Sequence, residues 1–265
     1  MNDLLISELH SEQKGLLSKL VLLEEFIFDS EYAELKAINN IIASCQLAIV
    51  ATESALERAE QLINTLFIDE LLLDRRRLFY TPQAYQIESS LEYRSIAPSV
   101  KAVIIRHIIE ACDFDCDLTL LAGKIMVRIV CDDVYAIIFD PVTGESLNLS
   151  EFDVLMDDVE DPEQLQPDTL PHQELITLYL TGLKNEFMKA ARFNDALKCV
   201  DILLAFQPND PFERRDRGFL LHQLDCFKVA VDDYKYFVQQ CPKDPAAQLL
   251  KMQLEQITIA DTVLH

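Results

Sequence analysis

Hydrophobic positions in the first quarter of the chain recur at the spacing of an α-helix. Residues 16–27 carry leucine and isoleucine along one stripe, and the segments 32–50 and 53–67 repeat the pattern. Neither proline nor glycine, the residues that most often interrupt helices, occurs from Leu16 to Thr81. The N-terminal part is therefore predicted to be helical.

The pattern changes after Pro98. Apolar residues from Val100 to Ala111 fall on one helical face, and from Asp117 to Pro141 the period becomes two, as in strands. The predicted strands are 118–121, 125–130 and 134–139, with Asp132-Asp133 as the turn between the last two. This order predicts a small antiparallel sheet behind one helix.

An acidic, proline-containing stretch follows the predicted sheet. Residues 151–168 hold eight acidic side chains and no basic one, and Pro162, Pro167 and Pro171 lie near the end of the stretch. Such composition is typical of a linker. We expect residues 1–160 to form one part, 161–171 a linker and 172–265 a second part.

The C-terminal part contains an internal repeat. Residues Phe193, Ala196, Pro208, Asp210 and Pro211 recur 34 residues later as Phe227, Ala230, Pro242, Asp244 and Pro245. A period of 34 is that of the helix-turn-helix tetratricopeptide repeat. The predicted repeats are about 177–210 and 211–244, and a capping helix is expected at 245–258.

Composition narrows the function classes. The formal net charge is -22, which disfavours nucleic acid and anionic membranes because they attract basic proteins. No apolar run approaches the roughly 18 residues of a membrane span, and the first ten residues do not resemble a signal peptide. An acidic, soluble protein of the cytoplasm is the expectation.

Cofactor and metal motifs are missing from the sequence. The five glycines are never clustered, as a phosphate-binding loop requires, and the seven cysteines include no C-x-x-C pair. We therefore expect no cofactor and no bound metal, with the cysteines as free thiols in a reducing compartment.

The order of these parts resembles a bacterial family that joins a transglutaminase-like core to a tetratricopeptide tail, the family of the first product of the invasion-regulator B operon. The motifs that carry the resemblance are 209–211, 215–218, 223–226, 236–238 and 241–242 in the tail, and Asp140-Pro141 with 144–147 before it. The resemblance covers about residues 30–265.

The resemblance implies a papain-like fold in which a Cys at a helix start attacks a carbonyl, a strand His takes its proton and an Asp on the next strand orients the His. The matching positions here hold Ala97, Lys124 and Asp140. A methyl group cannot attack a carbonyl, and a protonated lysine is a poor base. The triad is thus predicted to be degenerate, with Lys124 and Asp140 able to form a structural ion pair instead.

Other clusters allow a functional and a structural interpretation. Cys112 and Cys116 near His107 and Asp113 would suit either a displaced nucleophile or a packed helix end. Two charge runs would suit either ligand binding or solvated surface, the latter being preferred: the basic Arg75–Arg77 and the acidic Asp157-Asp158.

The tetratricopeptide register predicts a peptide-binding groove on the first helix of each repeat. Lys189, Arg215 and His222 would offer donors to an acidic peptide, unless the chain's own N-terminal part fills the groove. The full set of predicted groove residues is Asn185, Met188, Lys189, Arg215, Phe219, His222 and Gln223.

Together these observations predict an α+β protein: a helical N-terminal part, a small antiparallel sheet with a papain- or transglutaminase-like helix, and C-terminal all-α tetratricopeptide repeats. The predicted function is a non-catalytic protein-interaction or scaffold role, with a protein or peptide as partner. The alternative is a Cys-His hydrolase or acyltransferase with a displaced nucleophile.

Overall fold

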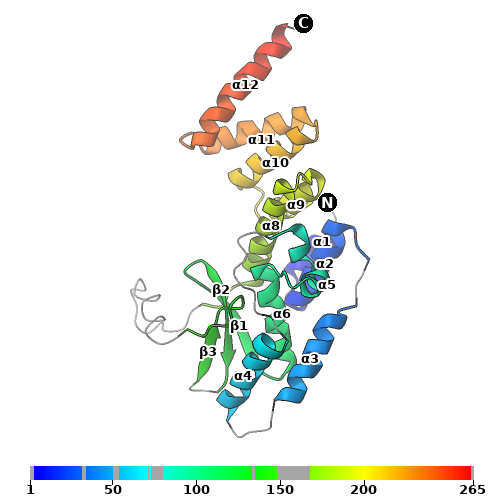
Figure 1. Ribbon diagram of the computed structural model, residues 1–265. Coiled ribbons are helices and arrows are strands. Elements are labelled where there is room, and N and C mark those ends of the chain that lie inside the picture. The colour runs from blue at the N-terminus through cyan, green and yellow to red at the C-terminus, as the bar shows by residue number, and fades with distance from the viewer. Residues whose placement is uncertain are drawn as a thin grey trace, which may run out of the picture. The chain divides into compact units, whose positions relative to one another are not determined.

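A computed structural model describes residues 3–31, 34–49, 54–70, 72, 80–132, 135–147 and 168–263 (Figure 1). Helices predominate, with one small sheet, as predicted. The elements in chain order are α1 (Asp3–His10), α2 (Leu16–Phe28), α3 (Lys36–Ala48), α4 (Ala55–Asn64), the π-helix η1 (Thr65–Asp69), the 3-10 helix η2 (Pro82–Tyr85), α5 (Ile87–Glu92), α6 (Pro98–Ala111), β1 (Asp115–Leu121), β2 (Lys124–Val130), β3 (Ala136–Phe139), α8 (His172–Lys189), α9 (Phe193–Phe206), α10 (Pro211–Gln223), α11 (Phe227–Gln240) and α12 (Pro245–Val263).

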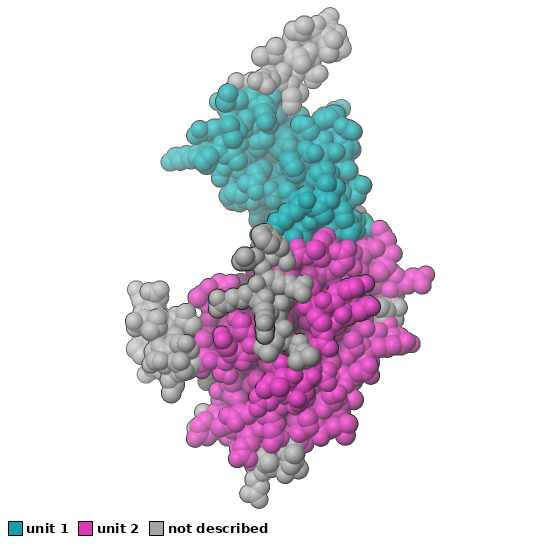
Figure 2. Space-filling model, viewed as in Figure 1, with its two compact units in different colours: residues 1–10, 180–265 teal, residues 11–179 magenta. Residues whose placement is uncertain are grey.

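The chain divides into two compact units, residues 11–179 and residues 1–10 with 180–265 (Figure 2). Helix α1 is grouped with residues 180–265 in the repeat-containing unit, where the His10 ring meets the Phe206 ring edge-on at 5.2 Å. The predicted domain bounds 1–160 and 172–265 stay a prediction. The predicted linker residues 161–167 lie outside the described residues, so the linker stays a prediction.

In the unit 11–179, the first backbone amides of two helices donate hydrogen bonds to carboxylates from other helices. The N-cap residues of α3 and α5 provide no side-chain cap. Glu24 of α2 accepts a hydrogen bond from the Ile87 amide at 2.8 Å, and Glu88 of α5 accepts one from the Ala37 amide at 3.2 Å. These contacts place negative charge at the positive ends of the helices. They link α2 to α5 and α5 to α3.

The sheet is antiparallel, with strand order β1-β2-β3. Thr119 of β1 lies opposite Met126 of β2. Ala122 and Gly123 join β1 to β2 with φ of 48° and 74°, the positive values of a tight hairpin turn. All three strands match the sequence prediction in order. The predicted turn Asp132-Asp133 includes a residue outside the described set.

Helix α6 packs against β1 and β2 and is buried on most of its surface. Its buried residues are Ser99, Val100, Lys101, Ala102, Val103, Ile104, Ile105, Ile108 and Ile109. A helix that is enclosed on nearly all sides belongs to a core rather than to a surface. Packing on nearly all sides therefore sets the position of the first residues of α6 relative to the sheet.

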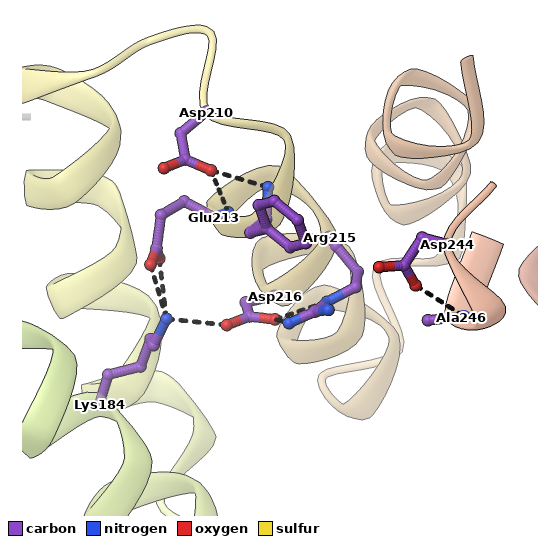
Figure 3. A network of polar contacts seen from close by, with 8 residues as sticks. Lys184, Asp210, Glu213, Arg215, Asp216, Asp244 and Ala246 are labelled. Atoms are coloured by element: carbon purple, nitrogen blue, oxygen red, sulfur yellow. Dashed lines mark hydrogen bonds and ion pairs between the residues drawn. The ribbon is translucent and has the colours of Figure 1, made fainter. Parts of the chain in front are cut away.

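The repeat-containing unit repeats its helix starts along with its sequence. Asp210 accepts hydrogen bonds from the amides of Phe212 and Glu213 at 2.8 and 3.2 Å, and Asp244 accepts one from Ala246 at 2.8 Å (Figure 3). The proline after each aspartate occupies the first helical position, where no backbone donor is needed. The recurring Asp-Pro pair thus begins α10 and α12.

The two repeats differ in how their helix pairs are joined. Arg217 of α10 donates two hydrogen bonds of 2.7 Å to the buried carboxylate of Asp233 in α11. The positions 34 residues earlier are Leu183 and Cys199, both buried. An ion pair in one repeat therefore stands where the other repeat has two buried apolar side chains.

Candidate functional site

A pocket of about 650 Å³ lies in the unit 11–179 where the start of α6, the β1–β2 turn and the turn after β3 meet. Pro98 and Ser99 come from α6, Lys124 from the start of β2, and Asp140 from the end of β3. Two of the three predicted triad positions, Lys124 and Asp140, thus line one pocket. The helix that holds the third begins at its wall.

Ala97 itself does not line the pocket. It is the N-cap of α6, fully buried, and its amide donates to the Ala84 carbonyl at 2.8 Å. The side chains that line the pocket from this helix start are those of Pro98 and Ser99, and of these only Ser99 carries a polar group. The sequence prediction located the helix start but did not single out Ser99.

Lys124 and Asp140 share the pocket without the ion pair that the sequence allowed. Among the described residues no salt bridge joins them. Asp140 instead organises its own turn, since its Oδ1 accepts from the Val142 amide at 2.7 Å and its carbonyl accepts from the Gly144 amide at 2.8 Å. The Asp140 carboxylate therefore stabilises the turn that follows β3.

Lys101 is a buried cation that the apolar pattern of this helix did not reveal, because lysine side chains are seldom fully buried. Its Nζ donates to the Val142 carbonyl at 3.0 Å and lies 5.8 Å from the centre of the Phe67 ring. Lys101 is 1% exposed. It fixes the turn after β3 to α6 and so helps to shape the pocket wall.

Of the cysteines near the end of α6, Cys112 contacts another thiol, that of Cys45. A hydrogen bond with Cys45 lowers the pKa of the Cys112 thiol, against the effect of burial, and the same contact followed by burial raises the pKa of Cys45. Burial raises the pKa of Cys116. In the described parts of the chain, no cysteine is hydrogen-bonded to a histidine.

Two charge runs weighed in the sequence fall outside the described residues: Arg75–Arg77 and Asp157-Asp158. Both interpretations of each run stay predictions.

The predicted groove residues on α8 and α10 differ in exposure. Asn185, Lys189, Phe219 and Gln223 are exposed, whereas Met188, Arg215 and His222 are half-buried. The His222 ring meets the Phe227 ring edge-on at 5.0 Å. The exposed four are thus the side chains that a ligand could meet first.

Two of the three residues predicted to donate hydrogen bonds to a peptide, Arg215 and Lys189, already form ion pairs with acidic neighbours. Arg215 donates to Asp216 at 2.8 and 3.0 Å (Figure 3) and lies 5.4 Å from the Phe237 ring centre. Lys189 is 62% exposed and pairs with Glu186 at 2.7 Å. Lys189 is therefore the donor of this pair that is more accessible to an acidic peptide.

A buried ion cluster joins α8 to α10. Lys184 donates to Glu213 and to Asp216, each at 2.8 Å, and its side chain is 4% exposed (Figure 3). Burial lowers the pKa of Lys184, but the two carboxylates outweigh it and the net shift is upward. The pairing offsets the cost of removing three charges from water. The repeat pattern does not reveal Lys184, because the equivalent position in the next repeat is Gly218.

Comparison with known proteins gives two family matches. A model of the transglutaminase-like superfamily matches residues 32–177, which is more than half of the chain, and a tetratricopeptide-repeat model matches residues 183–255. The chain belongs to the transglutaminase-like superfamily and carries a tetratricopeptide region after that core. The family resemblance expected from the motifs is confirmed.

Three curated bacterial relatives are similar to this chain. UPF0162 protein YchA of Escherichia coli (strain K12) is 30% identical over 213 residues, 79% of either chain. Protein SirB1 of Salmonella typhimurium is 26% identical over 245 residues, 91% of this chain and 88% of the relative. A UPF0162 protein of Vibrio cholerae is 42% identical over 97 residues, 37% of this chain and 35% of the relative. No solved structure matches.

Among the described residues, none of the helices combines the length and the hydropathy that crossing a membrane requires.

Proposed function

We propose that this chain is a non-catalytic interaction or scaffold protein of the bacterial cytoplasm, in which a degenerate transglutaminase-like core carries a peptide-binding tetratricopeptide region. Regulation is the role such a scaffold would serve. The observation that carries the proposal is that Ala97, Lys124 and Asp140 stand at the three positions to which the family resemblance assigns the catalytic residues. The Asp140 carboxylate is occupied by a turn amide at 2.7 Å.

The pocket also lacks the conditions for a serine-lysine reaction. A lysine becomes a base when it is desolvated in an apolar pocket. Lys124 is exposed, and no hydrogen bond joins it to Ser99 in the described residues. This geometry supports a core that does not turn over a substrate.

The alternative, a displaced cysteine nucleophile, finds its best candidate in Cys112. A catalytic cysteine needs a neighbouring base and an accessible sulfur. Cys112 is 8% exposed, and its partner Cys45 is a thiol with a raised pKa, which cannot serve as a base near neutral pH. The geometry favours a packing role for this pair.

Alkylation kinetics distinguish the two functions. With iodoacetamide between pH 5 and 8, we expect Cys226, the exposed cysteine of the described set, to react first and no faster than a free thiol. Peptide mass spectrometry at each time point gives the rate for every cysteine. A Cys226→Ser variant serves as control and should lose the first-reacting site. Rapid modification of Cys112 at pH 6 would favour the enzyme.

The groove is tested by reversing charge at its exposed positions. Acidic peptides selected from a displayed library should bind about tenfold more weakly to Lys189→Glu/Gln223→Glu, because repulsion replaces attraction. The matched control is Lys228→Glu on α11, which is also exposed and should leave binding unchanged. Arg215 is unsuitable, since it is bound to Asp216 within the fold. Equal affinity of both variants would remove the groove from the proposal.

A further inference from the structure

The pocket beside α6 has the size and lining of a small-molecule site. Its volume of about 650 Å³ lies within the range of ligand pockets, roughly 300–1,000 Å³. A single amino acid would leave much of this space empty, whereas two or three linked residues would fill it. The proposed scaffold function assigns no ligand to this part of the chain.

One wall of the pocket is suited to a carboxylate. Ala97 provides no side-chain cap for α6, and the first helical hydrogen bond runs from the Lys101 amide to the Ala97 carbonyl, so the Ser99 amide precedes it. Unpaired amides at a helix start attract anions.

Ser99 is a second and independent sign of a ligand on this wall. It is only 5% exposed, it lines the pocket, and no partner for its hydroxyl occurs among the described residues. Because the rest of the residue is enclosed, a molecule in the pocket can supply the hydrogen bond that the described residues do not offer the hydroxyl. Lys124 adds an exposed ammonium group to the same pocket, without an ion pair in the described parts of the chain.

The remaining walls suit an ammonium group and an apolar side chain. Asp140 and Glu145 contribute carboxylates from the turn after β3. Tyr85 and Leu178 contribute apolar surface. Two carboxylates would repel a phosphate dianion, but they would attract the amino end of a zwitterion.

We propose that this pocket binds a short zwitterionic peptide of two or three residues with an apolar side chain. Its carboxylate lies toward Ser99, Lys124 and the start of α6, and its ammonium group toward Asp140 and Glu145. No bond of the peptide is made or broken. The inference goes beyond the proposed function, because it concerns the core and not the repeats.

Calorimetric titration with leucyl-leucine tests the proposal on the full chain. The N-acetyl and C-amide forms each remove one charged end, and each should bind at least about tenfold more weakly. Lys124→Met and Ser99→Ala should weaken leucyl-leucine but not its C-amide. Glu145→Gln should weaken leucyl-leucine but not its N-acetyl form. Lys228→Met, an exposed lysine outside the pocket, is the matched control.

Three results would overturn the inference. They are no heat of binding up to about 10 mM leucyl-leucine, binding of a blocked form as tight as that of leucyl-leucine, and tighter binding of inorganic phosphate than of the peptide. Release of free leucine would contradict the non-catalytic function while supporting the ligand. The two proposals can therefore fail separately.

Discussion

Lys184→Met is expected to lower the free energy of unfolding of the repeat-containing unit by about 3–5 kcal/mol. The substitution leaves Glu213 and Asp216, whose side chains are 14% and 15% exposed, without their shared cation. Burial already raises the pKa of Glu213, and Lys184 opposes that effect. Without the lysine, two neighbouring carboxylates would have to be desolvated together.

Urea unfolding followed by circular dichroism measures this effect, and hydrogen exchange of the α10 amides assigns it to the correct unit. Lys189→Met is the matched control on the same helix, because its side chain is 62% exposed and its ion pair should contribute less than about 1 kcal/mol. Adding Glu213→Gln and Asp216→Asn to Lys184→Met should recover part of the loss. Equal effects of the two lysine substitutions would show that the buried cluster does not hold α8 to α10.

Gly144→Ala is expected to destabilise the unit 11–179 by about 2–5 kcal/mol, the sum of two costs. The φ of 74° disfavours a side chain by about 1–2 kcal/mol. An added Cβ would also lie 2.7 Å from Cγ of Phe67, and such overpacking costs about 1–3 kcal/mol. Phe67 cannot move freely, because its ring packs edge-on against Phe139 at 5.7 Å.

Gly123→Ala separates the two costs. Gly123 has the same φ of 74°, but no atom lies within 4 Å of its added Cβ. Only the backbone cost of about 1–2 kcal/mol is then expected. Thermal unfolding of the two variants in parallel gives the difference. A loss no greater for Gly144→Ala than for Gly123→Ala would show that the Phe67 contact relaxes without cost.

Much of the architecture could be predicted because it rests on local periodicity. The 34-residue repeat is visible since Asp210 and Asp244 cap α10 and α12 in the same way. The strands alternate visibly, and Pro98 marks the first helical position of α6. Each of these signals acts within a few residues, which is the range over which a sequence can be interpreted directly.

The chemistry of the candidate site was less predictable, because it depends on distant contacts. The expected pair of Lys124 and Asp140 does not form, since the Asp140 carboxylate accepts from an amide two residues away. Lys101 is a charged residue that the apolar pattern does not include, yet it is buried against the turn that contains Val142. Lys101 is buried because its ammonium group bonds to the Val142 carbonyl, 41 residues further along the chain. A pattern within the helix cannot show such a contact.

The place where the two compact units divide, inside α8 between Tyr179 and Leu180, limits how the protein can be cut into pieces. A fragment that starts at the predicted boundary, residue 172, would carry Leu175, Ile176 and Tyr179 away from the neighbours that now bury them. It would also lack α1, whose Leu5 and Leu9 are buried. Such a fragment would expose apolar surface at its first helix and be prone to aggregation.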